Sequence, residues 1–492
     1  MVNVLTHGAW FAIIVLLGTM IPYGLAEHAQ GGLNTLFILG FLGTWRYSWA
    51  ALNFSRAAIY YRIVYPRRKA RAFARFNALK VPSHAYFLVT TYMVGTESTI
   101  ACYRALFAAA ARARDGATIV VSVVDGADER LIRTLYDTCR EDLSRVELLI
   151  DRIKSSGKRD ALARSLMIIG RKAPTRHDIV IFVDGDTCVP LDVVAQSAPW
   201  FTNRKMGALT TDEGVIIAKK NLFRDWFILR FNQRQVMMCS MGLSSRVLTL
   251  TGRMSVFRAD LATDPGFIKG IGHDFLDHWR LGRVTFLTGD DKSTWFWLLK
   301  NGYEMAYLPD VRAWSMETQP RPTFLDSSNT LMVRWFGNMM RTNGRALRLG
   351  WGRIGFFTWW SILDQRLSVW TTLVGPTSVL LASLVVSPSV IPIYIAWVML
   401  TRYMFCVVLS AFRGTWFPIT HPPILYFGQV AGALVKTYVM FRLDKQKWTR
   451  QGAGGAASGL TFTARLMAIE SNVYHALSFV WLTLAVILLA QL

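Results

Sequence analysis

The sequence is short of cysteine and of charge. Only five of its 492 residues are cysteines, none stands in a CxxC pair, and no cysteine and histidine cluster has zinc-site spacing. This argues against a disulfide or zinc scaffold and favours a reducing compartment for the soluble part of the chain. Charged residues are 18% of the chain and hydrophobic residues 52%, whereas a soluble domain usually carries more charge.

Acidic residues are scarcer than basic ones. Asp and Glu number 32 against 55 Lys and Arg, so the formal net charge is +23. Such an excess is typical of nucleic-acid binding, of a membrane surface that faces the cytosol, or of a protein that holds an acidic polymer. After the second apolar segment the basic residues are Arg62, Arg67, Arg68, Lys69, Arg71 and Arg75. We therefore predict a lipid bilayer as partner and no nucleic acid.

Long apolar segments occur towards both ends of the chain. Residues 8–25 and 33–61 precede a soluble region, and the lack of a basic stretch before the first argues against a cleaved signal peptide. Residues 355–363 and 426–441 are predicted to lie at the interface. The later segments that are long enough to span a bilayer are 368–386, 390–411 and 474–492. We predict five spans, or six if 426–441 also crosses.

The distribution of basic residues orients this layout. Two spans before the soluble region place the basic stretches 62–80 and 341–353 in the cytosol. The predicted units are two transmembrane helices (1–65), a cytosolic domain (66–325), interfacial helices (326–365), a transmembrane hairpin (366–412), an interfacial helix with a Gly-rich loop (413–460) and a final transmembrane helix (461–492).

The soluble region alternates strand-like and helix-like runs. Apolar, β-branched runs at 86–91, 118–124, 146–150 and 179–183 are separated by helical stretches. This alternation predicts an α/β fold with a mixed, mostly parallel sheet. Ligands of such sheets bind at the carboxyl ends of the strands, where Asp125 and Asp184 fall.

Two acidic pairs are the main chemical signals. Asp184 and Asp186 follow a buried strand, and carboxylates there could hold Mg²⁺ or Mn²⁺ against a diphosphate; the alternative is a turn or a helix cap. Asp290 and Asp291 precede a helix-like run, so one could be a general base with its pKa raised by the other; the alternative is helix capping.

Further residues could complete a site for a nucleotide-activated sugar. Asp125 could accept hydrogen bonds from a base, or form a turn with the next glycine. Lys158 could approach a diphosphate, or be a solvated helix start. Arg334 and Trp335 could neutralise a leaving phosphate and stack on a sugar, or face lipid. The run from Lys445 to Arg450 could be a mobile lid, or a plain cytosolic loop.

The order of these motifs resembles the processive, inverting, membrane-embedded family-two glycosyltransferases, the group of cellulose, chitin and hyaluronan synthases. The resemblance covers nearly the whole chain and implies an A-type glycosyltransferase fold. It implies that Asp291, beside Asp290, is the base and that Asp186, with Asp184, binds Mg²⁺ or Mn²⁺. It also implies two further sets of residues. Those for the nucleotide are Thr91, Tyr92, Asp125, Lys158, Arg334, Lys447 and Arg450, and those for the acceptor are Gly252, Arg253 and Trp335.

Within this family, several stretches resemble the alginate branch, the mannuronan synthases. They are Trp45-Arg46-Tyr47-Ser48, residues 250–258, 277–283 and 287–293, and Phe441-Arg442-Leu443-Asp444. The resemblance implies GDP-mannuronate as donor, a growing β-1,4-linked polysaccharide as product and the bacterial inner membrane as location. Because no RxxxR plus DxSxxG pair is present, it also implies a co-polymerase partner that carries the cyclic-di-GMP receptor. The family's QxxRW motif has Leu331 in place of its Gln.

Three alternatives remain open at this point. The first is the same chemistry with UDP-glucose, which would give a β-glucan. An acid-bearing donor instead needs a cation in the sugar pocket, for which Arg253 and residues 277–283 are candidates. The second is a single transfer to a lipid. The third is a membrane scaffold or transporter with a degenerate transferase domain, which the intact acidic set disfavours.

Overall fold

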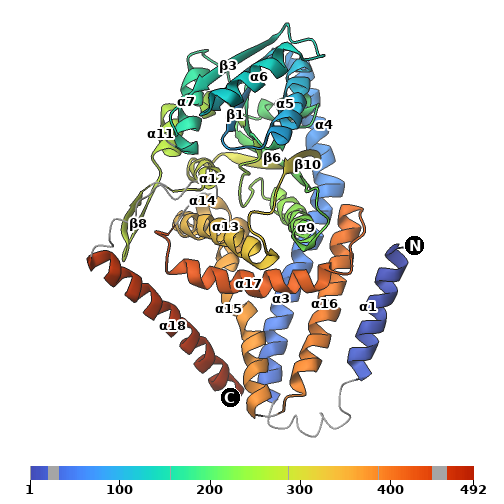
Figure 1. The fold of residues 1–492 in the computed structure, drawn as a ribbon. Coiled ribbons are helices and arrows are strands. Elements are labelled where there is room, and N and C mark those ends of the chain that lie inside the picture. Colours follow the sequence, from blue (N-terminus) through green and yellow to red (C-terminus); the bar gives the residue numbers. More distant parts are fainter. Residues whose placement is uncertain are drawn as a thin grey trace.

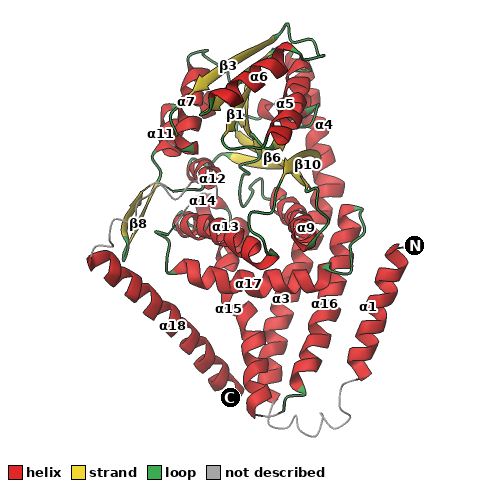
Figure 2. Ribbon diagram, viewed as in Figure 1, coloured by secondary structure: helices red, strands yellow, loops and turns green. Residues whose placement is uncertain are grey.

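The computed structural model describes residues 2–19, 33–155, 157–285, 287–385, 387–445 and 462–491. A domain that contains the sheet lies at one end of the molecule, and long helices extend from it at the other (Figures 1 and 2). This division follows the sequence, because the strand-forming runs all fall between the two groups of apolar segments.

Helices α1 and α3 precede the sheet-containing domain in the chain. Helix α1 spans Val2–Thr19 and α3 spans Leu33–Ile59. A π-helical turn, Tyr60–Val64, joins α3 to α4, Tyr65–Leu79, so one continuous helical segment enters the domain. The segment ends where Lys80 adopts a left-handed conformation with φ of 50°.

The main sheet has eight strands in the order β3-β2-β1-β4-β7-β6-β10-β5. Their bounds are β1 Ala85–Thr91, β2 Ala117–Val123, β3 Val146–Arg152, β4 Ile179–Asp184, β5 Thr187–Cys188, β6 Met206–Ile216, β7 Met254–Arg258 and β10 Glu304–Met316. Pairs β3/β2, β2/β1, β1/β4 and β6/β10 are parallel, whereas β7 runs antiparallel to both its neighbours and β5 runs antiparallel to β10. The predicted mixed, mostly parallel α/β fold is therefore confirmed.

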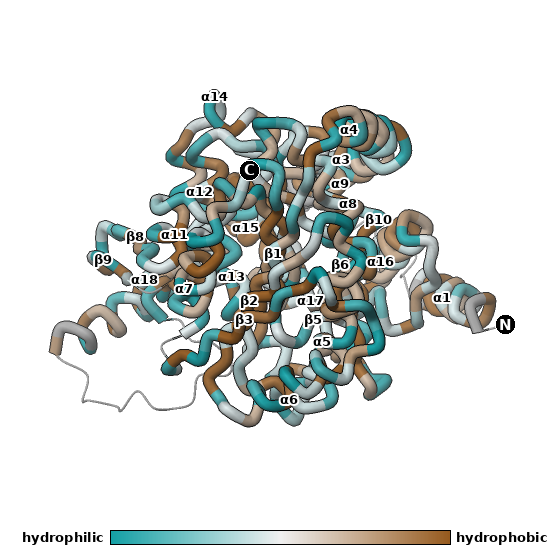
Figure 3. Tube along the Cα trace, turned by 90° about the horizontal axis from the view of Figure 1, so that it is seen from above, coloured by the Kyte–Doolittle hydropathy of each residue, from teal (hydrophilic) through white to brown (hydrophobic). Residues whose placement is uncertain are grey.

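Helices cover the sheet and bury its central strands. Strands β1, β2 and β4 are buried along almost their whole length, as expected for parallel strands covered on both faces. Figure 3 shows hydrophobic residues along the central strands and a more hydrophilic α6 at the rim. The packing helices are α5 Thr96–Ala111, α6 Gly126–Asp137, α7 Lys158–Gly170, α8 Val193–Ser197, α9 Leu222–Gly242, α10 Ala259–Ala262, α11 Pro265–Gly272 and α12 Asp290–Lys300.

The remaining elements form the lower part of Figure 1. They are α13 Phe324–Leu347, α14 Trp351–Ile354, α15 Phe356–Val385, α16 Val390–Arg413, α17 His421–Met440 and α18 Phe462–Gln491. Helix α17 runs across α15 and α16 and contacts both, and α13 packs on α17 from the side of the sheet-containing domain (Figure 1). Within the described residues, Phe356–Val385, Val390–Arg413 and Arg465–Leu489 are long and apolar enough to cross a membrane.

The structure differs from the prediction in the region of α15. Residues 355–363 and 368–386 were expected as an interfacial helix followed by a separate span, but Phe356–Val385 is one continuous helix. Asp364, the charge that suggested a break, lies within the helix because Arg46 of α3 pairs with it at 2.5 Å. Because this ion pair neutralises the charge of Asp364, the helix can continue through that residue. The loop expected at 451–459 lies outside the described residues.

Asp212 anchors the catalytic domain to the long helices. This buried carboxylate on β6 accepts hydrogen bonds from Tyr307 Oη at 2.9 Å, from Arg312 Nε at 2.6 Å and from Arg413 Nη1 at 2.7 Å. Arg413 is the last residue of α16 and also donates to the Glu213 carbonyl at 3.0 Å. The sheet and a candidate membrane span are thus joined through a buried ion pair.

We expect Asp212→Ala to destabilise the protein strongly, because it leaves the buried Arg413 guanidinium without its partner. Breaking a buried pair in this way costs about 3–5 kcal/mol. Thermal unfolding of the purified protein measures the loss. Glu147→Ala is the control, since its pair with Lys172 is exposed and is worth about 0–1 kcal/mol. Equal melting temperatures for the two variants would contradict the anchoring role.

Candidate active site

The Asp184-Gly185-Asp186 triplet is held by its backbone at the end of β4. The Asp184 amide donates to the Arg253 carbonyl at 3.0 Å, and the Gly185 amide donates to the Thr90 carbonyl at 3.0 Å. The Asp186 carbonyl accepts from the Met316 amide at 2.9 Å. Segments from three parts of the chain therefore fix the triplet, so its carboxylates project from a rigid edge of the sheet.

Gly185 is required by close packing against β1. A Cβ at this position would lie 2.6 Å from Thr91 Oγ1 and 3.0 Å from the Thr90 carbonyl oxygen. The Thr91 hydroxyl cannot easily move, because it is buried and hydrogen-bonded to Tyr103 Oη at 2.7 Å. The predicted nucleotide contact at Thr91 thus has a structural role in supporting the triplet.

We expect Gly185→Ala to lower catalytic rate by at least about 10²-fold, because displacement of reacting groups by about 1 Å has that effect. Steady-state reaction rates of the wild-type and variant proteins, measured with the same substrate, give the change. Gly302→Ala serves as a contrast, since Gly302 has no neighbour within 4 Å of the added Cβ, although its positive φ of 78° adds strain. Wild-type activity of Gly185→Ala would show that the triplet tolerates displacement.

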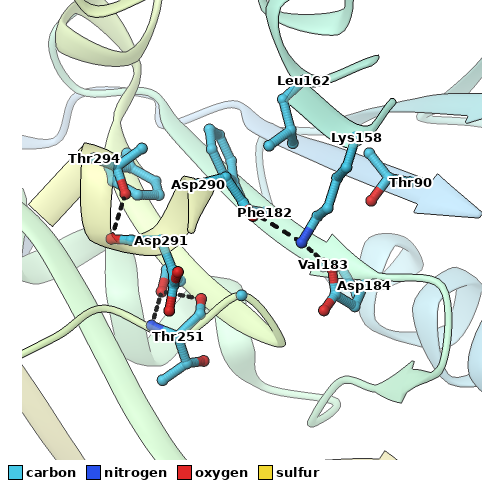
Figure 4. A pocket seen from close by; sticks show the side chains of 13 residues that line it. Thr90, Lys158, Leu162, Phe182, Val183, Asp184, Thr251, Asp290, Asp291 and Thr294 are labelled. Carbon is cyan, nitrogen blue, oxygen red and sulfur yellow. Dashed lines mark hydrogen bonds and ion pairs between the residues drawn. The ribbon is translucent and has the colours of Figure 1, made fainter. Parts of the chain in front are cut away.

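Lys158 lies between carboxylates from two parts of the chain. At the start of α7, its Nζ is 2.7 Å from Asp184 Oδ1 and 3.1 Å from Asp290 Oδ2 (Figure 4). Burial alone would lower the pKa of Lys158, but the two carboxylates raise it above its ordinary value. Burial raises the pKa of Asp184 to about 6, with Asp186 and Asp290 adding to the rise and Lys158 opposing it. Lys158 therefore begins a helix, but its side chain is paired with carboxylates, which disfavours the alternative of a solvated helix start.

The second acidic pair was predicted to precede a helix, and in the structure it is the start of that helix, α12. Asp290 and Asp291 form the first turn of this helix, and both line the pocket that also holds Lys158 and Asp184. Burial raises the pKa of Asp291, and the neighbouring Asp290 raises it further. A carboxylate with a raised pKa in a cleft is suited to accept a proton.

Residues that the sequence analysis missed hold α12 in place. Arg159 is buried and donates to the Leu287 and Ile271 carbonyls and to Ser293 Oγ, the last at 2.8 Å. On the other side, Asn338 Oδ1 accepts from Thr288 Oγ1 at 2.8 Å. The only sequence signal was the position of Arg159 beside Lys158, and its partners lie more than a hundred residues away along the chain.

Of the predicted acceptor residues, Gly252 lines the pocket, whereas Arg253 is held in ion pairs. Thr251 and Gly252 line the pocket, and a Cβ on Gly252 would lie 3.4 Å from Lys158 Nζ. Arg253 is paired instead: its Nη2 lies 2.7 Å from Glu317 Oε1, and its Nη1 lies 3.7 Å from Glu213 Oε2. The charge of Arg253 is thereby balanced, which weakens its candidacy as the cation for an acid-bearing donor.

Helix α13 brings Arg334 and Trp335 to the site. Burial is the main influence on the pKa of Arg334 and lowers it. The carboxylates of Glu317, Asp184 and Asp291 act in the opposite direction. The Trp335 ring stacks on Trp226, with centroids 5.6 Å apart and an interplanar angle of 22°. Leu331, where the family motif has Gln, is buried in the hydrophobic core. The side chain at this position therefore supports packing.

Other predicted residues lie outside this pocket lining. Asp125 caps α6, where its Oδ1 accepts from the Ala127 amide at 2.9 Å. Tyr92 follows β1 and is 38% exposed. Residues 277–283 form a hairpin in which Arg283 Nε pairs with Asp277 Oδ1 at 2.7 Å. Lys447 and Arg450 lie outside the described residues.

The fold and the site define a glycosyltransferase. Residues 82–338 match the family described as glycosyltransferase like family 2, and the chain belongs to this family. It is 40% identical over 453 residues to Glycosyltransferase alg8 of Pseudomonas syringae pv. tomato, which covers 91% of each chain. It is also 40% identical over 419 residues to Glycosyltransferase alg8 of Azotobacter vinelandii, covering 85% of this chain and 84% of that one.

A solved structure also matches part of the chain. It is the mannosyltransferase PcManGT from Pyrobaculum calidifontis in complex with GDP-Man and Mn²⁺, with 16% identity and a TM-score of 0.40 over 78% of this chain and 97% of that one. The relatives confirm the predicted family-two membership and the resemblance to the alginate branch. The prediction that the protein is an enzyme is therefore confirmed, and the alternative of a non-catalytic scaffold is set aside.

Proposed function

We propose that this enzyme is a processive, inverting synthase that makes β-1,4-linked polymannuronate from GDP-mannuronate and passes it across the bacterial inner membrane. The observation that carries the proposal is the convergence of Asp184, Asp290 and Asp291 around Lys158. This cluster lies between the sheet and α13, which in turn packs on α15, a helix that could cross a membrane. The similarity to two Alg8 glycosyltransferases supports the product class.

In the proposed reaction, Asp291 takes the proton from the 4-hydroxyl of the growing chain. That oxygen forms a bond to the anomeric carbon of the donor as the bond from this carbon to the diphosphate oxygen breaks. The electron pair leaves with GDP, and in-line attack inverts the anomeric configuration. Lys158 and Arg334 supply positive charge near the departing diphosphate.

Asp184 and Asp186 fit a hard divalent cation. No group of three metal-binding side chains occurs among the described residues, but Mg²⁺ is commonly held by one or two carboxylates together with substrate phosphates. We therefore propose Mg²⁺ or Mn²⁺ at this pair, where it would neutralise charge on the diphosphate.

Two cations beside the predicted acceptor tryptophan favour an acidic polymer over a neutral glucan. Arg230 Cζ lies 4.4 Å from the centre of the Trp335 ring, and Lys436 Nζ lies 4.8 Å from that of Phe336. Burial lowers the pKa of Arg230 to about 10, with Arg253 adding to the effect. Within the described part of the chain, neither Arg230 nor Lys436 forms an ion pair. Carboxylates on passing uronate units would balance both charges.

Purified enzyme incubated separately with labelled GDP-mannuronate and UDP-glucose tests this proposal. We expect label from GDP-mannuronate to appear in polymer, and none from UDP-glucose. Arg230→Gln should lower incorporation from GDP-mannuronate, while Arg164→Gln, on the exposed side of α7, should not. Incorporation of glucose alone would overturn the proposed donor and favour a β-glucan synthase.

We also propose that a co-polymerase subunit carrying a cyclic-di-GMP receptor acts with this enzyme. The absence of a paired RxxxR and DxSxxG motif in this chain supports a receptor on another subunit. Activity of membranes that contain both subunits should depend on cyclic-di-GMP, whereas activity that is the same with and without the dinucleotide would contradict the proposal.

A further inference from the structure

A second cavity lies away from the catalytic carboxylates. It is lined by a hairpin that contributes no residue to the active-site pocket. This hairpin consists of β8, Phe275–His278, and β9, Gly282–Thr285. The cavity lies between the hairpin, α13, α15 and the ends of α17 and α18. We propose that it binds the phosphate group of an anionic phospholipid headgroup.

Five arginines line this cavity, and three of them already have partners. Arg280 donates to the Phe441 carbonyl at 2.6 Å and to Ser471 Oγ at 2.9 Å. Arg345 makes two hydrogen bonds to Asp274, at 2.8 and 2.9 Å. Arg341 donates to the Leu443 carbonyl at 3.2 Å. Arg280 therefore links the hairpin to the end of α17 and to α18, and Arg341 links α13 to the segment that follows α17.

The other two arginines, Arg348 and Arg366, have no ion-pair partner in the described ranges. Nη1 of Arg366 lies against α13, 3.2 Å from where a Cβ on Gly344 would be. Asp277 also lines the cavity, but it pairs with Arg283 at 2.7 Å. Asp444, which acts electrostatically on His278, pairs with Lys445 at 3.3 Å. Among the described residues, Arg348 and Arg366 therefore add two positive charges to the cavity that no ion pair neutralises, which favours an anionic ligand.

His278 adds a donor between these arginines. Its Nδ1 accepts hydrogen bonds from the Arg280 and Leu281 amides, at 3.3 and 3.2 Å. In the neutral ring the proton therefore lies on Nε2, which can donate to a ligand. Burial lowers the pKa of His278, and Arg280, Arg348 and Arg366 lower it further. The ring is thus a neutral donor in a strongly positive environment.

The apolar part of the cavity favours a lipid over a free phosphate. Met440, Phe441 and Tyr474 line one side, and the indole of Trp279 is 81% exposed. Arg366 and Tyr474 belong to helices that are long and apolar enough to cross a membrane. Basic pockets between such helices on the cytosolic side are suited to anionic headgroups, and exposed Trp is typical of the interface.

Native mass spectrometry of the detergent-purified full-length protein tests the proposal. Phosphatidylglycerol, phosphatidylcholine and sn-glycerol 3-phosphate are added separately to wild type and to Arg348→Ala/Arg366→Ala. We expect wild type to retain phosphatidylglycerol in preference to the other two, and the double variant to bind it about tenfold more weakly. Arg348→Lys/Arg366→Lys should retain binding, because it keeps both charges.

Arg67→Ala/Arg71→Ala is the matched control, since both side chains are exposed on α4 and the total charge changes equally. If Arg366 variants fail to fold, Arg348→Ala alone decides, because Arg348 is exposed at the end of α13. Equal phosphatidylglycerol retention by wild type and the Arg348 variants would overturn the proposal. Equal retention of phosphatidylcholine, or of glycerol 3-phosphate, would also overturn a site for anionic lipid.

Discussion

Asp291→Asn is expected to abolish polymer formation while leaving nucleotide binding largely unchanged. The amide has nearly the same shape as the carboxylate but cannot accept the proton of the acceptor hydroxyl. Loss of a positioned general base lowers rates by about 10²–10⁴-fold. Incorporation of labelled sugar measures the rate, and titration of GDP measures binding. Asp326→Asn is the control, because Asp326 is also in the first turn of a helix but is exposed and outside the pocket.

The pH dependence of the wild-type enzyme follows from the same residue. Burial, and then Asp290, raise the pKa of Asp291 above the ordinary range of an aspartate, which is about 3.9. The unprotonated base is therefore lost as the pH falls through this raised pKa, so the rate should decline at a higher pH than that at which an ordinary aspartate is protonated. Full activity of Asp291→Asn, or an unshifted acidic limb, would contradict the assignment of Asp291 as base.

Lys158→Gln is expected to weaken donor binding and to move the acidic limb of the rate profile to higher pH. The substitution removes the cation that lies within 3.1 Å of both Asp184 and Asp290. Without it, repulsion raises the pKa values of the clustered carboxylates, so the base is unprotonated only at higher pH. Loss of one charged contact to the reacting groups costs about 10²–10³-fold in rate.

The controls for Lys158→Gln separate catalysis from folding. Lys158→Arg keeps the charge and should retain part of the donor affinity. Arg164→Gln removes a cation from the same helix, but its partner Asp151 lies away from the pocket lining. Thermal unfolding identifies any variant that fails to fold. An unchanged KM and an unchanged pH profile in a folded Lys158→Gln would show that Lys158 is only structural.

Four of the eight strands of the main sheet, β1 to β4, were predictable to within about two residues at each end. Runs such as residues 179–183 are β-branched and apolar because helices cover both faces of the sheet, and that composition is a local signal. The acidic site was predictable for a related reason, since carboxyl ends of parallel strands meet at one edge. Asp184 and Lys158 could therefore be placed near one another before their contact was known.

The residues that could not be predicted depend on contacts between distant segments. Arg159 is next to Lys158, and nothing local distinguishes its buried side chain from a solvated one. Arg253 was a candidate cation for an acid-bearing donor, but Glu317, just after β10, and Glu213, on β6, pair with it. The continuity of α15 likewise depends on Arg46, more than 300 positions from its partner Asp364. Such pairings follow from tertiary packing, which a local pattern does not record.

The most direct test of processive synthesis is the length of the product while donor is in large excess over enzyme and little of it has been consumed. Wild-type protein in lipid nanodiscs is given excess labelled GDP-mannuronate, and the product is separated by size at successive early times. We predict that label appears in long chains from the earliest time points, because the same chain stays bound between additions. Label confined to short, lipid-linked products at every time point would contradict polymerisation and indicate a single-transfer enzyme.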